Sequence, residues 1–578
     1  MAVEKAHVVR RTVNDEQADK KKAFQNYEKE QWRSWPNQGA FDGLDEHREP
    51  VQLQVRGNIP SWAAGTFYRT GPGQSVVENT SRGTHHVSHW FDGFAQVHKF
   101  DLIPSVHDKT NCSVTYSSRC QSEEYIKMVR KKGWRADLSF GQRNDPCVGL
   151  FAKFMSFLVP RQLNNNVTVL PDVPGLQDNH SSPGRHRKEP SNVYACTDNA
   201  TLQKLDPRTL EPLGKATQKN LHPDLRGPMS CAHAQRDLET GDLFNFNLEP
   251  GLKATYRIFR VNAASGTVDI LATVSDKELA SAYIHSFFLT ENHVILCVPT
   301  SHYGWNGLKV LWERNIIESI KPFDKTDGCK WLVVDRRHGR GVVARFSTPA
   351  SFFFHTVNAF EVRAKDENGN EVTEFCMDYI KYENTNIMRM LYYDILMDRD
   401  GAAAEGLAKC GLDSAQMYLV RHKFAMHSFP QQQNHNHNHS AYSQRATEVF
   451  SIPGPHAGEL PAINPGRAGK AYRYAYGVGN GGRGIFMDCL VKTDLKTRDA
   501  LIWNGPVGHT PGEPMFIPRP GGVREDDGVI MTLVLDGSGQ KSYLLCLDAT
   551  TLEELGRAET KFPIALALHG SRTPFAET

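Results

Sequence analysis

Residues 528–551, GVIMTLVLDGSGQKSYLLCLDATT, contain two apolar runs separated by the turn-forming sequence DGSGQ. Runs rich in Val, Leu and Ile and bounded by Gly, Asp and Ser are typical of two strands in a hairpin. Similar runs lie along most of the chain, among them GTFYRTGPG at 65–73, TYRIFRV at 255–261 and HVILCVPT at 293–300. The repeated pattern predicts antiparallel strands from about residue 50 to the end, and therefore an all-β fold.

Short strands at intervals of about 10–20 residues are typical of a sandwich, a barrel or a propeller. The chain has no fixed-period repeat and no clear domain boundary, which favours one large β-propeller over several sandwiches. We expect this single domain to span residues 46–578. Residues 1–45 form a charged N-terminal arm, and the stretch 14–35 has no wide apolar face, so the arm is expected to be frayed or loosely docked.

Composition excludes several classes of protein. The formal net charge is only +2, which argues against a nucleic-acid-binding protein. The first residues have no apolar core of a signal peptide, and no apolar run is long enough to span a membrane. The 11 cysteines form no CxxC pair. These features predict a cytoplasmic protein with reduced thiols.

Three segments interrupt the strands: DPCVGLFAKFMSFLVP at 145–160, and two polar loops at 172–190 and 428–444. The first is too short to span a bilayer and suits either a helix at a membrane surface or a helix that caps the core. Cys147, just before its apolar part, is either a lipidation site or a buried thiol. The side chains expected to contact a membrane are Leu150, Phe151, Phe154, Met155, Phe157 and Leu158.

The chain has 24 histidines. The HNHNH run at 435–439 lies in a polar low-complexity stretch, and we do not expect it to be a metal site. Four others lie in or beside apolar strand-like runs: His233, His285, His355 and His569. A buried imidazole needs a partner, because leaving it unsatisfied costs roughly 1–3 kcal/mol. Their wide spacing leaves two interpretations open: convergence on a propeller axis, or separate core histidines with individual hydrogen bonds.

Nine segments of the sequence resemble, in order, the carotenoid cleavage oxygenase family of carotenoid and stilbene dioxygenases. They include AHAQRDLETGDLFNF, FFHTVNAFE, GELPAIN, GEPMFI and IALALHG. The segments lie at 65–73, 89–100, 194–211, 232–246, 284–296, 353–361, 458–479, 512–534 and 564–570. The resemblance therefore covers about residues 50–578, nearly the whole chain.

The resemblance implies a seven-bladed β-propeller with a helical and loop cap over its metal-bearing face. It implies an iron(II) ion on the propeller axis, held by His233, His285, His355 and His569. Carboxylates behind these ligands would fix the imidazoles, and they map onto Asp198, Glu459 and Glu513. The family has a glutamate where Asp198 stands. Because aspartate is one methylene shorter, its bond to an imidazole is expected to be lengthened, shifted or bridged by water.

The implied reaction is cleavage of one carbon–carbon double bond of a polyene by O₂, with no catalytic acid, base or nucleophile beyond the metal centre. An apolar tunnel would select the bond that is cut. Candidate lining residues are Thr197, Phe352, Phe353, Phe354 and Phe360, and packing in the blade core is the alternative for each phenylalanine. The partners implied are a hydrophobic polyene, O₂ and a membrane or lipid droplet contacted peripherally by residues 145–160.

Within the family, the sequence is most similar to the fungal branch that cleaves torulene to form apocarotenoids. Cleavage of a stilbene such as resveratrol is the alternative, with Tyr125 and Lys127 as candidate phenol-binding residues. A metal-free propeller that serves as a binding scaffold, and an isomerase, are further alternatives.

Overall fold

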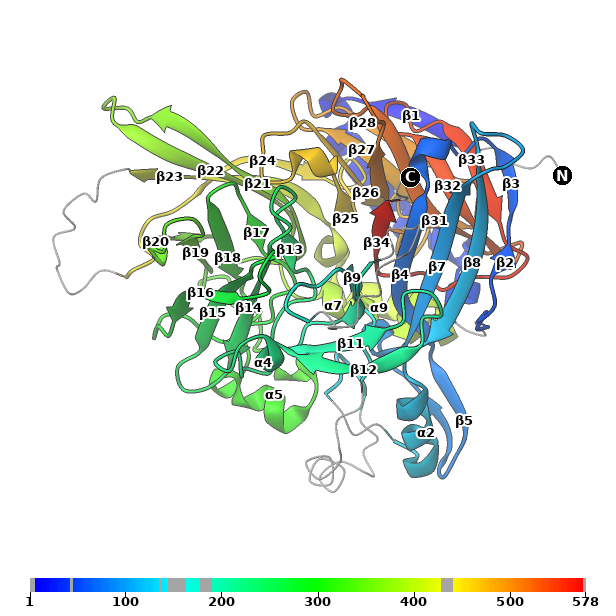
Figure 1. Ribbon diagram of the computed structural model, residues 1–578, viewed down its shortest axis with the longest axis horizontal. Helices are drawn as coiled ribbons and strands as arrows, with labels where there is room; N and C mark the ends of the chain where they lie inside the picture. Colours follow the sequence, from blue (N-terminus) through cyan, green and yellow to red (C-terminus); the bar gives the residue numbers. More distant parts are fainter. Residues whose placement is uncertain are drawn as a thin grey trace.

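The computed structural model describes residues 6–41, 45–134, 138–143, 163–176, 190–427 and 440–574. Seven antiparallel sheets of four to six strands are arranged around a common axis (Figure 1). A separate two-stranded hairpin projects from this body with helix α2 (Glu123–Lys132). The predicted fold, a seven-bladed β-propeller, is confirmed.

Four blades follow one another directly along the chain, each in the order given, starting at the axis. They are β9 (Thr168–Pro171), β10 (Val193–Cys196), β11 (Thr201–Leu205) and β12 (Pro212–Thr217); β13 (Gln235–Arg236), β14 (Leu243–Glu249), β15 (Thr255–Val261) and β16 (Val268–Val274); β17 (Phe288–Leu289), β18 (His293–Val298), β19 (Cys329–Asp335) and β20 (Val342–Thr348); and β21 (Phe352–Lys365), β22 (Glu371–Tyr382), β23 (Tyr418–His427) and β24 (Thr447–Pro453).

Three blades combine strands from distant parts of the chain. They are β25 (Glu459–Ala462), β26 (Tyr474–Gly479), β27 (Cys489–Asp494), β28 (Ala500–Asn504) and β1 (His7–Arg11); β29 (His509–Pro511), β31 (Gly528–Asp536), β32 (Lys541–Asp548), β33 (Glu554–Glu559) and β3 (Gln54–Gly57), with β30 (Met515–Pro518) beside β31; and β34 (His569–Pro574), β4 (Gly65–Gln74), β7 (Phe94–Pro104), β8 (Cys112–Cys120) and β2 (Val51–Gln52). The projecting hairpin is β5 (Val76–Thr80) and β6 (Gly83–His86).

The ring closes where the C-terminal strand β34 pairs with β4, with His569 opposite Thr70. The blades then pack face to face, so inner strands such as β18 and β32 are buried on both sides. Between the β17–β20 and β21–β24 blades, for example, Trp331, Phe353 and Tyr379 lie in one cluster. Burial of each such side chain stabilises the fold by roughly 1.5–3 kcal/mol.

The N-terminal arm is firmly attached, so the prediction of a frayed or loosely docked arm is wrong. Strand β1 forms the outer edge of a blade by pairing with β28. Helix α1 (Glu16–Glu28) follows, and the buried Glu16 accepts hydrogen bonds from Arg498, with Nε to Oε1 at 3.0 Å. The helix has no wide apolar face, as the sequence indicates, and it is held by the buried side chains of Ala23 and Tyr27 and by this ion pair, in which the Arg498 side chain is 33% exposed.

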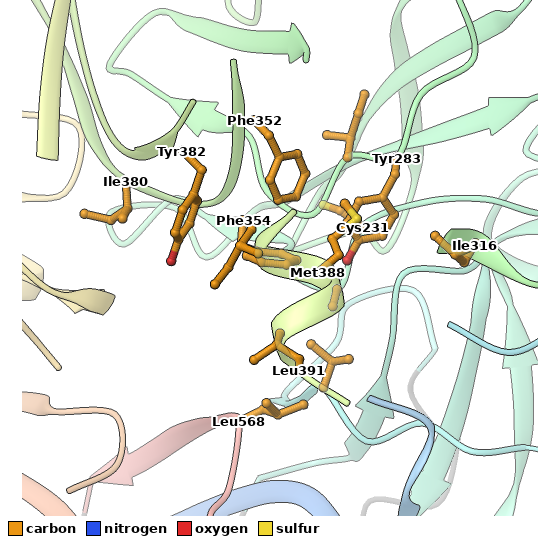
Figure 2. Close-up of a cluster of buried hydrophobic side chains, with 14 of the residues drawn as sticks. Cys231, Tyr283, Ile316, Phe352, Phe354, Ile380, Tyr382, Met388, Leu391 and Leu568 are labelled. Carbon is orange, nitrogen blue, oxygen red and sulfur yellow. The ribbon is translucent and has the colours of Figure 1, made fainter. Parts of the chain in front are cut away.

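Short helices cover one end of the propeller. The connection from β22 to β23 contains α7 (Ile387–Met390), α8 (Tyr393–Leu396) and α9 (Ala402–Cys410), and the connection from β18 to β19 contains α5 (Leu308–Glu313) and α6 (Ile316–Ser319). A further short helix of the described residues is α4 (Gln218–Leu221). Met388 and Leu391 of the first connection lie over the buried aromatic side chains in Figure 2. This confirms the expected helical cap.

Several predicted segments lie outside the described residues. They are the apolar segment 145–160 with Cys147, the HNHNH run, and most of the polar loops at 172–190 and 428–444. No helix in the described part of the chain has the length and apolar character needed to cross a membrane. Eight of the described cysteines are buried free thiols.

Candidate metal centre

Four histidines from four blades meet on the propeller axis. His233 and His285 lie just before β13 and β17, His355 lies in β21, and His569 begins β34. One ligand atom from each lies within 4.8 Å of those from the other three. Of the two interpretations that the residues alone leave open, the structure selects convergence.

The ε nitrogens of these histidines face one another. The Nε2 atom of His233 lies 3.1 Å from that of His285 and 3.2 Å from that of His569, and His355 Nε2 lies 3.0 Å from His569 Nε2. A metal–nitrogen bond of about 2.1 Å places adjacent ligands about 3.0 Å apart, so the spacing fits a metal ion. Imidazole nitrogen is a ligand of intermediate softness, which suits Fe, Zn, Cu or Ni.

A carboxylate bonds the δ nitrogen of three of the four imidazoles. The Nδ1···O distances are 2.7 Å for His285 and Asp198, 2.5 Å for His355 and Glu459, and 2.8 Å for His569 and Glu513. An ionised carboxylate can only accept, so each Nδ1 donates and each Nε2 keeps its lone pair for the centre. In the described residues no carboxylate bonds His233.

Asp198 reaches His285 directly at 2.7 Å, so the expectation of a lengthened or water-bridged bond is wrong, and that of a shifted bond stays a prediction. Its other oxygen, Oδ1, accepts from the Ala232 amide at 2.9 Å, immediately before His233. The backbone of the neighbouring blade therefore holds the shorter side chain close to the imidazole. Asp198 also links the positions of two of the histidines.

Each carboxylate has a further buried neighbour. The Tyr283 hydroxyl donates to Asp198 Oδ2 at 2.7 Å, and burial together with the nearby charge of Glu459 raises the pKa of Tyr382 well above its usual value. Glu513 instead accepts from the Gly570 amide at 2.9 Å and lies 3.5 Å from Nη2 of Arg69, a guanidinium that is only 2% exposed. These contacts hold the carboxylates, and through them the imidazoles, in fixed positions.

The centre takes one group from every blade. The four histidines come from the blades of β13, β17, β21 and β34, and the carboxylates from those of β9, β25 and β29. Glu459 needs a close approach of β25 to β26: a Cβ on Gly458 would lie only 2.7 Å from the carbonyl carbon of Gly477. Leu460 has a φ of 50°, and its amide donates to Glu459 Oε2 at 3.0 Å. This strained turn positions the carboxylate.

Burial controls the ionisation of the centre. It lowers the pKa of His233 and of His569 well below the usual value, because a charged imidazole would be desolvated and close to other imidazoles. It raises the pKa of the Glu513 carboxyl to about 7, an effect that Arg69 opposes. The site therefore favours neutral imidazoles, the form that binds a metal.

An apolar cavity of about 370 Å³ lies on the cap side of the centre. Its lining includes Phe91, Phe140, Tyr283 and Ile316, together with the predicted Thr197 next to Asp198. Two predicted aromatic residues adjoin it through Tyr283: ring centroids lie 6.3 Å away for Phe352 and 6.4 Å for Phe354. Figure 2 shows Phe354 between Tyr382 and Tyr283.

Neither Phe353 nor Phe360 lines this cavity, and no ring contact joins either of them to Tyr283. Because side chains alternate along β21, Phe353 points to the opposite face and packs between blades against Tyr379 at 4.8 Å. Phe360 lies further along the strand beside Tyr472, with the Arg421 guanidinium 5.1 Å from its ring. For these two residues the alternative prediction, packing within the propeller, holds.

The two candidate phenol-binding residues, Tyr125 and Lys127, do not lie in one site. Tyr125 is buried and lines the apolar cavity, whereas Lys127 points to solvent with a 61% exposed side chain and pairs with Glu124. Two residues apart on a helix, the side chains lie on different faces. The residues missed from sequence were Arg69, Tyr283 and Tyr382. Tyr283 could have been found from the sequence, because it lies two positions before His285 and therefore on the same side of an extended chain.

Comparison with known proteins gives consistent matches. The profile of a family described as retinal pigment epithelial membrane protein matches residues 40–574. Torulene dioxygenase from Fusarium fujikuroi is 52% identical over 585 residues, which cover 100% of both chains. Carotenoid dioxygenase from Neurospora crassa is 46% identical over 596 residues, covering 98% of this chain and 96% of its own.

Solved structures share the fold. A variant of apocarotenoid oxygenase from Synechocystis has a TM-score of 0.67 at 21% identity, covering 95% of this chain and 99% of its own. A cobalt-substituted form of the Synechocystis enzyme also has a TM-score of 0.67 at 21% identity, covering 94% of this chain and 98% of its own.

Proposed function

The chain belongs to the retinal pigment epithelial membrane protein family, the family of carotenoid oxygenases, and we propose that it is an iron(II)-dependent dioxygenase that cleaves torulene or a similar long polyene. The observation that carries the proposal is the set of four imidazoles with converging ε nitrogens, three of them fixed by carboxylates. The full-length similarity to a torulene dioxygenase supports the choice of substrate.

The residues present fit a ferrous ion. His233, His285, His355 and His569 would hold it, and four neutral ligands leave its full positive charge to be balanced by the carboxylates behind them. When bound, ferrous iron supplies the activation of dioxygen. Arg69 adds one positive charge to the three carboxylates, which leaves two negative charges opposite the divalent ion.

The side chains around the apolar cavity would bind and orient the polyene. Phe354, between Tyr382 and Tyr283, offers an aromatic face to the conjugated chain, and aromatic faces stabilise positive charge that develops on it. The cap excludes water from this side. Both oxygen atoms of O₂ enter the products, one in each new carbonyl group, so no proton has to move. Asp198, Glu459 and Glu513 are thus free to serve as positioning residues.

We also propose peripheral contact with a lipid surface at the cap. In the described residues, Trp305, Leu308 and Trp312 are 59%, 45% and 45% exposed. They lie on or beside α5, whose Val310 lines the apolar cavity. Exposed tryptophans suit the boundary between headgroups and acyl chains. A polyene dissolved in that layer would enter the cavity without crossing water.

The test is anaerobic loading of metal-free protein with iron(II), followed by incubation with torulene, β-carotene or resveratrol in parallel under ¹⁸O₂. We expect two carbonyl products from torulene, each carrying one labelled oxygen by mass spectrometry, and no product without iron. Cleavage of resveratrol alone would overturn the carotenoid assignment. Less than about half an equivalent of bound iron would favour a metal-free scaffold.

A further inference from the structure

A second cavity, the axial funnel, reaches the histidines from the side opposite the cap. It has a volume of about 490 Å³, and His233, His355 and His569 line it. Some residues that precede a histidine in the sequence line the apolar cavity, and some that follow one line the funnel. Met229 and Tyr283, which precede two of the histidines, line the apolar cavity, whereas Gln235, Ser286 and Thr356, which follow them, line the funnel. Among the described residues that line the apolar cavity there is no histidine.

The funnel has polar and apolar side chains along its wall and exposed charged side chains at its mouth. Its base is formed by His355 and His569, which are 8% and 4% exposed. At its mouth lie Glu239 and Lys470, whose side chains are 72% and 53% exposed. They form an ion pair of 3.0 Å that links the turn after β13 to the loop between β25 and β26.

Two arginines near the mouth are already bonded to other groups. Arg336 donates to Asp237 at 2.7 Å, and both side chains are buried. Arg236 donates to the carbonyl of Pro171 at 2.8 Å. The loop that carries Lys470 is held by Asn358, whose Nδ2 donates to the Lys470 carbonyl at 3.0 Å. The Glu239–Lys470 pair is therefore a solvent-exposed charge pair on a fixed rim.

We propose that the axial funnel is the route by which the hydrated metal ion reaches and leaves the four histidines, and that the Glu239–Lys470 pair sets the rate of entry. This inference rests on the proposed function, since it assumes that the histidines bind a metal. The apolar cavity offers a divalent ion less: its two carboxylates, Asp92 and Asp198, already accept hydrogen bonds, and much of the rest of its lining is aromatic or aliphatic, so the ion would lose water there without an imidazole to replace it. In the funnel, polar side chains and three imidazoles replace that water in turn.

The inference predicts opposite effects for two charge reversals at the mouth. Lys470→Glu places two carboxylates there and attracts a cation, so cobalt(II) uptake by metal-free protein should be about threefold faster. Glu239→Lys places two ammonium groups there, and uptake should be about threefold slower. Both effects should disappear in about 0.5 M salt, because salt screens exposed charges. The final cobalt content should stay unchanged.

Stopped-flow absorbance of the cobalt–imidazole complex measures the uptake rate, and metal analysis measures the final content. Lys309→Glu is the matched control: it changes the net charge by the same amount, but on α5 beside the apolar cavity. We expect it to leave the rate within about 1.3-fold of the original protein. Equal rates for all three variants would overturn the funnel as the entry route while leaving the metal site intact. A faster rate for Lys309→Glu alone would assign entry to the cap side. Failure of the unaltered protein to bind cobalt would overturn both the inference and the proposed function.

Discussion

Two regions of the molecule contain the same buried pair, an imidazole whose Nδ1 bonds a carboxylate. At the axis the pairs are His285–Asp198, His355–Glu459 and His569–Glu513. In the blades, His293 at the start of β18 bonds Glu361 of β21 at 2.9 Å, and both side chains are nearly as buried.

The difference lies at the other nitrogen of the ring. Nε2 of His293 has no hydrogen-bond partner, and its ring packs edge-on against Phe375 at 5.0 Å. Each axial Nε2 instead faces another Nε2. A histidine–carboxylate pair is thus a way to fix an imidazole, and it becomes a metal site only where several fixed imidazoles converge.

The largest effect should come from deleting an imidazole in each region. His355→Ala should lower bound iron below about one-tenth of an equivalent and abolish cleavage, because it removes a ligand and leaves Glu459 without its donor. His293→Ala should keep full iron and lose roughly 1–3 kcal/mol of stability. Metal analysis and thermal unfolding measure both. Loss of iron in His293→Ala would remove the distinction between the two regions.

Neutralising the carboxylates should give the next largest effect. Glu513→Gln should reduce iron occupancy or turnover by about tenfold, since the amide holds His569 less well and carries no charge. Glu361→Gln should leave both unchanged. Iron titration and initial cleavage rates check this prediction, and unchanged values for Glu513→Gln would contradict a role for Glu513 behind His569.

A smaller effect should follow from removing one hydroxyl. Tyr283→Phe deletes the hydrogen bond to Asp198 and keeps the ring in the apolar cavity. A hydrogen bond to a charged group is worth about 1.5 kcal/mol, so we expect about a tenfold weaker affinity for cobalt at most, and a change in the cobalt absorbance spectrum. Tyr379→Phe, a buried tyrosine beside His422, is the control. An identical spectrum in Tyr283→Phe would show that Asp198 needs no second partner.

The smallest effect concerns acid stability of the blade pair. Hydrogen bonds from His293, Thr290 and Asn292 outweigh burial and lower the pKa of Glu361 from 4.5 to about 2. A lowered pKa stabilises the folded state above the unfolded value and loses that stabilisation as pH falls from about 4.5 towards 2. Metal-free Glu361→Gln should therefore have a lower Tm at pH 7, by a few degrees, and a smaller further loss between pH 5 and pH 3. Parallel acid curves for the two proteins would contradict this.

The strands and the four axial histidines were accessible from sequence because both depend on local pattern or on recognisable segments. Apolar runs between turn residues predicted the blades, and His233, His285, His355 and His569 stood in such runs. The N-terminal arm was not accessible: β1 has a partner 489 residues away at the Arg10–Asp499 contact, and no local periodicity records it. The position of Phe353 could be predicted only once the strand was known. Side chains alternate along β21, so Phe353 lies on the opposite face from Phe352 and Phe354.

The sequence by itself determined the all-β class, the family resemblance and the residue types available for a metal centre. Only the tertiary structure decided which histidine–carboxylate pairs serve it. Arg69 and Glu513 are 444 residues apart and meet because the ring closes through β34 and β4. His293–Glu361 and His355–Glu459 are alike in chemistry. Closure of the seven blades places His293–Glu361 between two blades and His355–Glu459 on the axis. The physical reason is that a metal site requires several donors within a few ångströms, and in a propeller that proximity exists only where the inner strands converge.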